Sequence, residues 1–295
     1  MSIKRWFCVS VLLGAGILPG AYGADLSDLA FLPAAKQLVG ATSFGYGTDS
    51  GDLDDASGSR VSARASHEQT FIQSFDYGIG SRLSVSATWW HTWTTTHYDF
   101  PGSARTEDHR SNTQLMLGLT GRMLDQEHHG FDLDLIATVP GTLSLAMTRE
   151  LQNVTIRASG GFYHGGGGRG FDLVRDMDID VGRFWGYDAA LQGQLRLSSA
   201  ISLDLAVQYV SSNVDNARGT ADGDTFTVNF PDQVNFGATL NYQMIRDRLV
   251  MRLGGAYQIL GQRRDLYADP ALDLLTAPRK RRSVGLGFLY NVHGR

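Results

Sequence analysis

Apolar and polar side chains alternate along most of this chain. Leu83, Val85 and Ala87 occupy every second position of one segment, and serines lie between them. Successive side chains of a β-strand point to opposite faces of the sheet, so the pattern predicts strands with one apolar and one polar face. The alternation covers residues 83–93, 114–120, 131–139, 154–162, 187–197, 201–209, 234–242, 249–259 and 284–292, and more weakly 38–47, 65–78 and 144–150. We therefore expect about twelve strands.

The connections between these segments alternate in length. Short ones lie near residues 78–81, 124–130, 151–153, 198–200 and 245–248, and longer polar ones near 48–64, 97–110, 165–180, 211–231 and 261–281. The connection at 140–144 is short although it lies among the long ones. An outer-membrane barrel has short turns at one end and long loops at the other. The fold class we expect is all-β, a transmembrane antiparallel up-and-down β-barrel.

A soluble β-sandwich also alternates apolar and polar residues, so a secreted soluble protein is the alternative. Aromatic residues favour the membrane, because they gather near the ends of the apolar faces, as in the interfacial girdles of membrane barrels. Examples are Tyr77, Trp89, Trp93, Phe162, Trp185, Tyr209, Tyr242 and Tyr290.

The first residues have the features of a secretory signal peptide. Lys4 and Arg5 precede an apolar run over 6–18, and Ala21-Tyr22-Gly23 suits cleavage before Ala24. The run is too short for a membrane-spanning anchor helix. We expect a signal peptide over 1–23, a short periplasmic segment over 24–37 and the barrel over 38–295. The cleaved protein is expected in the outer membrane.

Composition narrows the choice. The mean hydropathy is −0.16, and no stretch is long and apolar enough for a transmembrane helix, which argues against a helical membrane protein. The single cysteine, Cys8, lies inside the expected signal peptide and excludes an internal disulfide. The formal net charge of −4 gives no reason to expect a nucleic-acid partner.

Charged residues on the polar faces are candidates for a lumen lining. We expect them to form a mixed-charge channel that orients a polar solute, or to pair with one another and close it, because buried charges need partners. They are Arg82, Arg122, Asp132, Asp134, Arg157, Asp188, Asp204 and Arg252.

One basic run, Arg279, Lys280, Arg281 and Arg282, precedes the last strand. Such a run attracts phosphate, so it is a candidate contact for lipopolysaccharide or for anionic solutes. The alternative is a solvated rim.

Other motifs carry little chemistry. Gly165, Gly167 and Gly170 match GxGxxG but open a polar loop and no helix. Aspartates at 176, 178 and 180 and at 52, 54 and 55 fit solvated loops better than a Ca²⁺ site. His128 and His129 would need a third metal ligand from elsewhere. We expect no metal and no cofactor.

Two short motifs resemble an outer-membrane transporter-like family that is named after the meta-cleavage pathway of phenol degradation. They are FDYGIGSRLSV at residues 75–85 and ATVPGT at 137–142, and the order of hairpins fits over most of 38–292. The resemblance implies a monomeric barrel that passes small molecules, aromatic or hydrophobic ones among them. It carries no catalytic residues.

We therefore expect a non-enzymatic channel for passive uptake of small solutes. Its expected partners are outer-membrane lipids, lipopolysaccharide, the solute and the outer-membrane assembly machinery. One alternative is a lipid hydrolase, for which His91, His97 or His164 would be the base, although none lies in a local nucleophile pattern. Another is a structural or adhesive barrel.

Overall fold

The structure is a computed structural model. It describes residues 26, 28–55, 57–100, 102, 106–139, 141–165, 168–172, 177–181, 184–211, 217–221, 224–229, 232–267 and 273–293. The expected signal peptide over 1–23, Gly167 and Asp176 lie outside the described residues.

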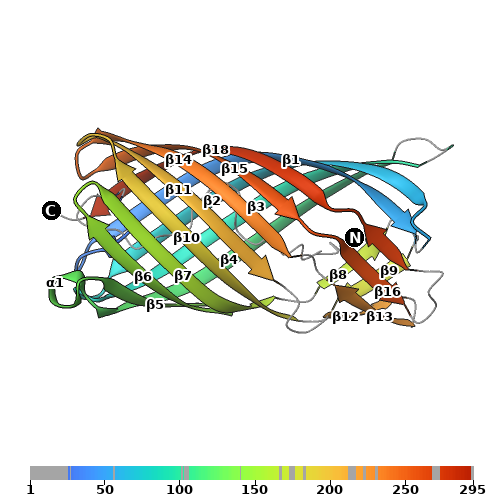
Figure 1. Ribbon diagram of the computed structural model, residues 1–295, viewed down its shortest axis with the longest axis horizontal. Helices are drawn as coiled ribbons and strands as arrows, with labels where there is room; N and C mark the ends of the chain where they lie inside the picture. Colours follow the sequence, from blue (N-terminus) through green and yellow to red (C-terminus); the bar gives the residue numbers. More distant parts are fainter. Residues whose placement is uncertain are drawn as a thin grey trace.

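Twelve long strands form a closed antiparallel barrel, which confirms the expected fold class (Figure 1). Each strand pairs with the next along this series, and β18 pairs with β1 to close the cylinder. Closure gives each long strand a partner strand on both sides, as a bilayer requires. The strands are β1 Leu38–Asp55, β2 Arg60–Gly78, β3 Leu83–Asp99, β4 Thr106–Leu124, β5 Asp132–Val139, β6 Thr142–Leu151, β7 Val154–Gly165, β10 Phe184–Arg196, β11 Ile201–Ser211, β14 Gln233–Ile245, β15 Leu249–Leu260 and β18 Arg279–His293.

Several expected loops are strands, so those predictions were wrong. β1 to β4 continue well into 48–64 and 97–110. Short paired strands occupy parts of the other three long connections: β8 Gly168–Asp172, β9 Met177–Val181, β12 Ala217–Ala221, β13 Asp224–Asn229, β16 Arg263–Tyr267 and β17 Leu274–Thr276. Apolar and polar residues alternate in a strand where one of its faces contacts lipid. Sheet beyond the bilayer meets water on both faces and shows no such pattern.

The two ends of the barrel differ. At the end that carries the C-terminus, which we call the turn end, the connections are short (Figure 1). One of them holds the four-residue helix α1, Gln126–His129, capped by Asp125. The opposite end, the loop end, carries the short extra strands. This is the asymmetry that the sequence predicts.

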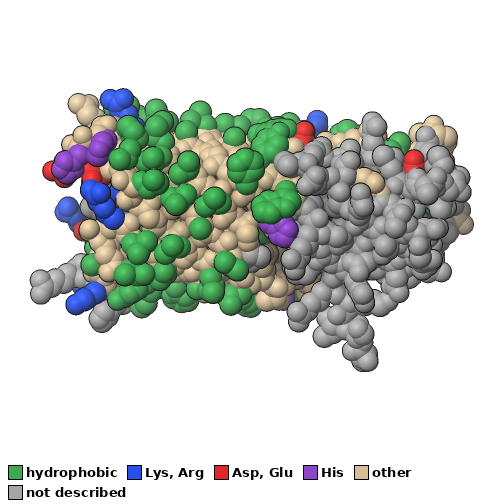
Figure 2. Space-filling model, turned by 90° about the horizontal axis from the view of Figure 1, so that it is seen from below, with side chains coloured by type: hydrophobic (Ala, Val, Ile, Leu, Met, Phe, Trp, Pro, Cys, Tyr) green, Lys and Arg blue, Asp and Glu red, His purple; other side chains and the backbone are tan. Residues whose placement is uncertain are grey.

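The strands sort their side chains by face. Large apolar residues such as Leu115, Phe162 and Val284 are exposed on the outside, where they cover the middle of the barrel (Figure 2). Serine, threonine, amides and several charged residues are buried on the inside. Among the described residues, no helix is long and apolar enough to cross a membrane.

Candidate functional site

The described residues that precede β1, Leu26 and 28–37, lie inside the turn end of the barrel. We call them the N-terminal segment. Leu26 and Phe31 are 2% and 3% exposed and pack with Val39, Val250 and Leu289 of the inner wall. Backbone bonds tie its other end to β2, because Lys36 N donates to Gly78 O at 2.8 Å and Gly78 N donates to Gln37 O at 3.0 Å. The segment therefore occupies part of the lumen cross-section.

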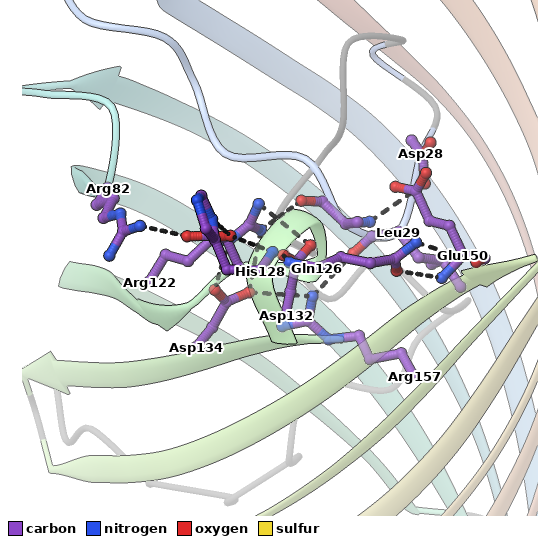
Figure 3. A network of polar contacts seen from close by, with 12 residues as sticks. Asp28, Leu29, Arg82, Arg122, Gln126, His128, Asp132, Asp134, Glu150 and Arg157 are labelled. Atoms are coloured by element: carbon purple, nitrogen blue, oxygen red, sulfur yellow. Dashed lines mark hydrogen bonds and ion pairs between the residues drawn. The ribbon is translucent and has the colours of Figure 1, made fainter. Parts of the chain in front are cut away.

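Three arginines from three strands bind consecutive residues of this segment (Figure 3). Arg122 of β4 donates to the carbonyl oxygen of Ala30 at 2.6 Å, and Arg157 of β7 donates to that of Leu29 at 2.8 Å. Arg196 of β10 pairs with the Asp28 carboxylate at 3.3 Å. Guanidinium groups suit this role because they offer several donors in a fixed fork.

Two carboxylates of β5 hold two of these arginines, Arg122 and Arg157, in place. Asp134 accepts from Arg122 Nε at 2.9 Å and lies 3.9 Å from Arg157 Nη1. Asp132 lies 3.2 Å from Arg122 Nη1 and also accepts from the backbone of Gln126 at 2.8 Å. The buried charges are thus paired, as their burial demands.

A second polar cluster lies on the neighbouring wall. Asp204 of β11 accepts from Gln194 and Asn241, each at 2.8 Å, and pairs with Arg252 of β15 at 3.2 Å. Arg252 Nε donates to Asn241 Oδ1 at 2.9 Å. The cluster links β10, β11, β14 and β15 on the inside.

The predicted lumen residues therefore fall into distinct places. Arg122, Asp132, Asp134 and Arg157 form one group with the N-terminal segment, and Asp204 with Arg252 forms another. Asp188 lies apart and accepts from Gln208 at 3.1 Å.

Arg82 has a different position from the rest of the predicted set. It lies in the turn after β2, its side chain is 55% exposed, and it pairs with Asp125 at the turn end. A turn residue has no strand parity, so alternation does not assign it to the lumen. Asp125 also bonds His128 Nδ1 at 2.5 Å, and this bond raises the pKa of His128 and lowers the pKa of Asp125.

Sequence reasoning missed the polar partners of this site. Gln194 and Asn241 also occupy inward positions, but the predicted lumen lining includes only charged residues. Asp28 lies in a segment without periodicity, so its role in the site is visible only from its ion pair with Arg196 in the structure.

The four residues of the basic run, 279–282, lie on β18 and point alternately to its two faces. Arg279 and Arg281 point inward, where Arg279 pairs with Asp49 at 3.0 Å and Arg281 pairs with Glu68. Lys280 and Arg282 are exposed on the outside. The four residues therefore belong to two different surfaces.

The inner wall is made of short side chains across the middle of β1, β14, β15 and β18. A Cβ added at Gly45 would meet nothing nearer than 3.8 Å among the described atoms. The inward positions there are Ser43, Gly45, Gly47, Gly237, Thr239, Gly254, Ala256, Ser283, Gly285 and Gly287. The ion pairs lie nearer the two ends.

The three candidate histidines have different neighbours. His97 lies against His67, with ring centroids 5.8 Å apart, and pairs with Glu107 at 2.9 Å. His91 lies on the outer face against Trp93, with ring centroids 4.1 Å apart, and bonds Thr113 at 2.5 Å. His164, on β7, packs against Trp185 at 4.7 Å. Among the described residues, no group of three or more His, Cys, Asp or Glu is placed to hold a metal ion.

No family model matches the sequence, and no curated protein does. The fold is similar to an outer membrane channel of Pseudomonas putida F1, with a TM-score of 0.54 and 15% identity over 88% of this chain and 96% of that chain. It is also similar to the transport unit of the autotransporter AIDA-I from Escherichia coli, with a TM-score of 0.57 and 11% identity over 86% and 90% of the two chains. At these identities the likeness establishes the fold, an outer-membrane β-barrel.

Proposed function

We propose that this protein is a passive outer-membrane channel for small solutes. The observation that carries the proposal is the run of glycine, alanine, serine and threonine on the inner wall, where a barrel with a purely structural role would be filled by larger side chains. The likeness in fold to an outer membrane channel is compatible with this role.

The solutes we propose are small, with aromatic or hydrophobic molecules among them, as the resemblance to the phenol-degradation family implies. The charged pairs at the two ends would orient a polar edge of such a molecule. At the turn end the path would run beside the N-terminal segment, so this is where passage is narrowest. The protein would act as a monomer, without catalytic residues, after signal cleavage and insertion by the assembly machinery.

Planar-bilayer conductance and liposome swelling test the proposal. Purified protein should give discrete conductance steps and should accelerate swelling in small solutes, including benzoate-sized aromatic ones. Protein without any conductance and without solute-dependent swelling would contradict it. A lipid-release assay on the same preparation checks the hydrolase alternative, which predicts release that is lost when His91 or His164 is changed.

A further inference from the structure

Lys280 and Arg282 form a cationic margin on the outside of the barrel. They follow one another on the outer face of β18, just beyond the exposed apolar residues Val284 and Leu286. Within the described part of the chain neither has a carboxylate partner, in contrast to Arg279 and Arg281. These two cations are therefore available to an anion from outside the protein.

The neighbouring strands extend this margin with hydrogen-bonding groups. In the β-sheet register Arg282 lies beside Thr48 of β1, and Thr48 lies beside His67 of β2. Neighbouring strands are about 4.8 Å apart, so Arg282 and His67 flank one narrow strip of the surface. His67 is exposed, and its Nδ1 bonds the Tyr46 hydroxyl at 3.0 Å.

Among the described residues, no ion pair joins Lys280, Arg282 or His67 to a carboxylate, although Glu107 pairs with His97, whose ring lies 5.8 Å from that of His67. Asp52, on the outer face of β1 and further toward the loop end, pairs with Arg60 at 3.0 Å. Tyr46 lies beside Val284 and Tyr257 lies beside Arg282, at the margin of the apolar band, in the position of an interfacial girdle. The surface thus changes from apolar to aromatic to cationic toward the loop end.

We propose that this strip, formed by Lys280, Arg282, Thr48 and His67, binds the phosphate groups of lipopolysaccharide in the outer leaflet. Acyl chains would pack on Val284 and the aromatic margin, and the lipid A phosphates would meet the two cations directly above. Long cationic side chains at a membrane interface reach up to the headgroups, and charge-assisted bonds to phosphate are among the strong ones. The proposal concerns the outer surface and does not depend on conduction through the lumen.

The test compares lipopolysaccharide binding to wild type, the variant K280Q/R282Q and the control R246Q/R248Q. Arg246 and Arg248 are exposed in the turn between β14 and β15, so the control removes two cations at the opposite end. Binding is measured by native mass spectrometry in detergent and by the rise in Tm on adding lipopolysaccharide. Retained heat-modifiable mobility on gels shows that each variant is folded.

We expect K280Q/R282Q to bind roughly thirtyfold more weakly, since each of the two cations near an anionic surface contributes about 1 kcal/mol. The control should bind as wild type does, and dephosphorylated lipopolysaccharide should bind wild type as weakly as intact lipid binds the variant. Equal binding by all three proteins would overturn the proposal. So would a K280Q/R282Q variant that changes the oligomeric state and leaves lipid binding unchanged, because the strip would then be an interface between copies.

Discussion

At the residue scale, a glycine has different consequences on the two faces of the wall. Gly45 of β1 faces the lumen, and Gly193 of β10 faces outward, where an added Cβ would meet nothing within 4 Å. An added Cβ fits at either position without displacing the described atoms around it. The pair therefore separates an effect on the lumen from an effect on the fold.

We predict that Gly45→Trp lowers single-channel conductance severalfold, because the indole would occupy the lumen beside a wall of short side chains. Gly193→Trp should conduct as wild type does, since its indole would lie among lipids. Conductance recorded in planar bilayers checks both. If the two variants are indistinguishable, the solute path does not pass Gly45.

The pair Asp125–His128 makes the turn after β4 sensitive to pH. Its bond raises the pKa of His128 above 6.5 and lowers the pKa of Asp125 below 3.8. The stabilising effect is present between these two shifted values. It is lost as pH rises through the pKa of His128, when the imidazole loses its charge, or falls through the pKa of Asp125, when the carboxylate is protonated.

We predict that NMR titration of His128 in detergent micelles gives a pKa above the ordinary histidine value of 6.5. Asp125→Asn should bring the value down toward 6.5, because the main cause of the shift is removed. Glu127→Gln, which removes a weaker electrostatic contribution, should change it far less. An unchanged titration in D125N would refute the assignment.

The cluster around Asp204 should carry measurable stability. Asp204→Ala would leave the donors of Arg252, Asn241 and Gln194 without their shared acceptor, at a cost of about 3 kcal/mol for breaking a buried pair. Asp247→Asn, in an exposed turn whose φ of 57° asparagine tolerates, should stay within about 0.5 kcal/mol of wild type. Urea unfolding from lipid vesicles measures both, and a small effect of D204A would mean that water replaces the carboxylate.

At the scale of elements, the sequence predicted the long strands better than it predicted the connections between them or the segment inside the barrel. Each of the twelve long strands coincides with an expected alternating segment, because lipid on one face and lumen on the other impose period two. That rule ends where the bilayer ends, so β8, β9, β12, β13, β16 and β17 were expected as loops. Residues 28–37 show no periodicity, and their position depends on contacts with distant strands.

Gly78 controls how closely that segment approaches β2. An added Cβ would lie 2.0 Å from the carbonyl oxygen of Ala34 and 2.5 Å from that of Pro33. Gly80, two residues further on, has nothing within 4 Å. The same substitution at the two positions therefore tests the segment with a matched control.

We predict that Gly78→Val displaces the N-terminal segment, because the new side chain would overlap backbone oxygens of that segment and overpacking costs about 1–3 kcal/mol. Channel conductance should rise, and limited proteolysis should cut the segment faster than in wild type. Gly80→Val should behave as wild type in both assays. Faster proteolysis of G78V with unchanged conductance would mean that the segment does not limit the path.

At the scale of the whole molecule, the asymmetry of the ends assigns an orientation. Short turns face the periplasm in outer-membrane barrels and long connections face outside. The loop end of this protein would then carry Lys280 and Arg282 to the outer leaflet, and the turn end would place the N-terminal segment on the periplasmic side. The lipopolysaccharide proposal depends on this assignment of direction.

Cysteine labelling in intact cells tests that direction cleanly, because the only cysteine, Cys8, lies in the expected signal peptide. Ser57 lies in the loop between β1 and β2, and Ser81 lies in the turn between β2 and β3; both are exposed. We predict that a membrane-impermeant maleimide labels Ser57→Cys in intact cells and labels Ser81→Cys only after lysis. Wild type should remain unlabelled in either condition, which also reports removal of Cys8. Labelling of Ser81→Cys in intact cells would reverse the barrel and place the cationic strip in the inner leaflet, away from lipopolysaccharide.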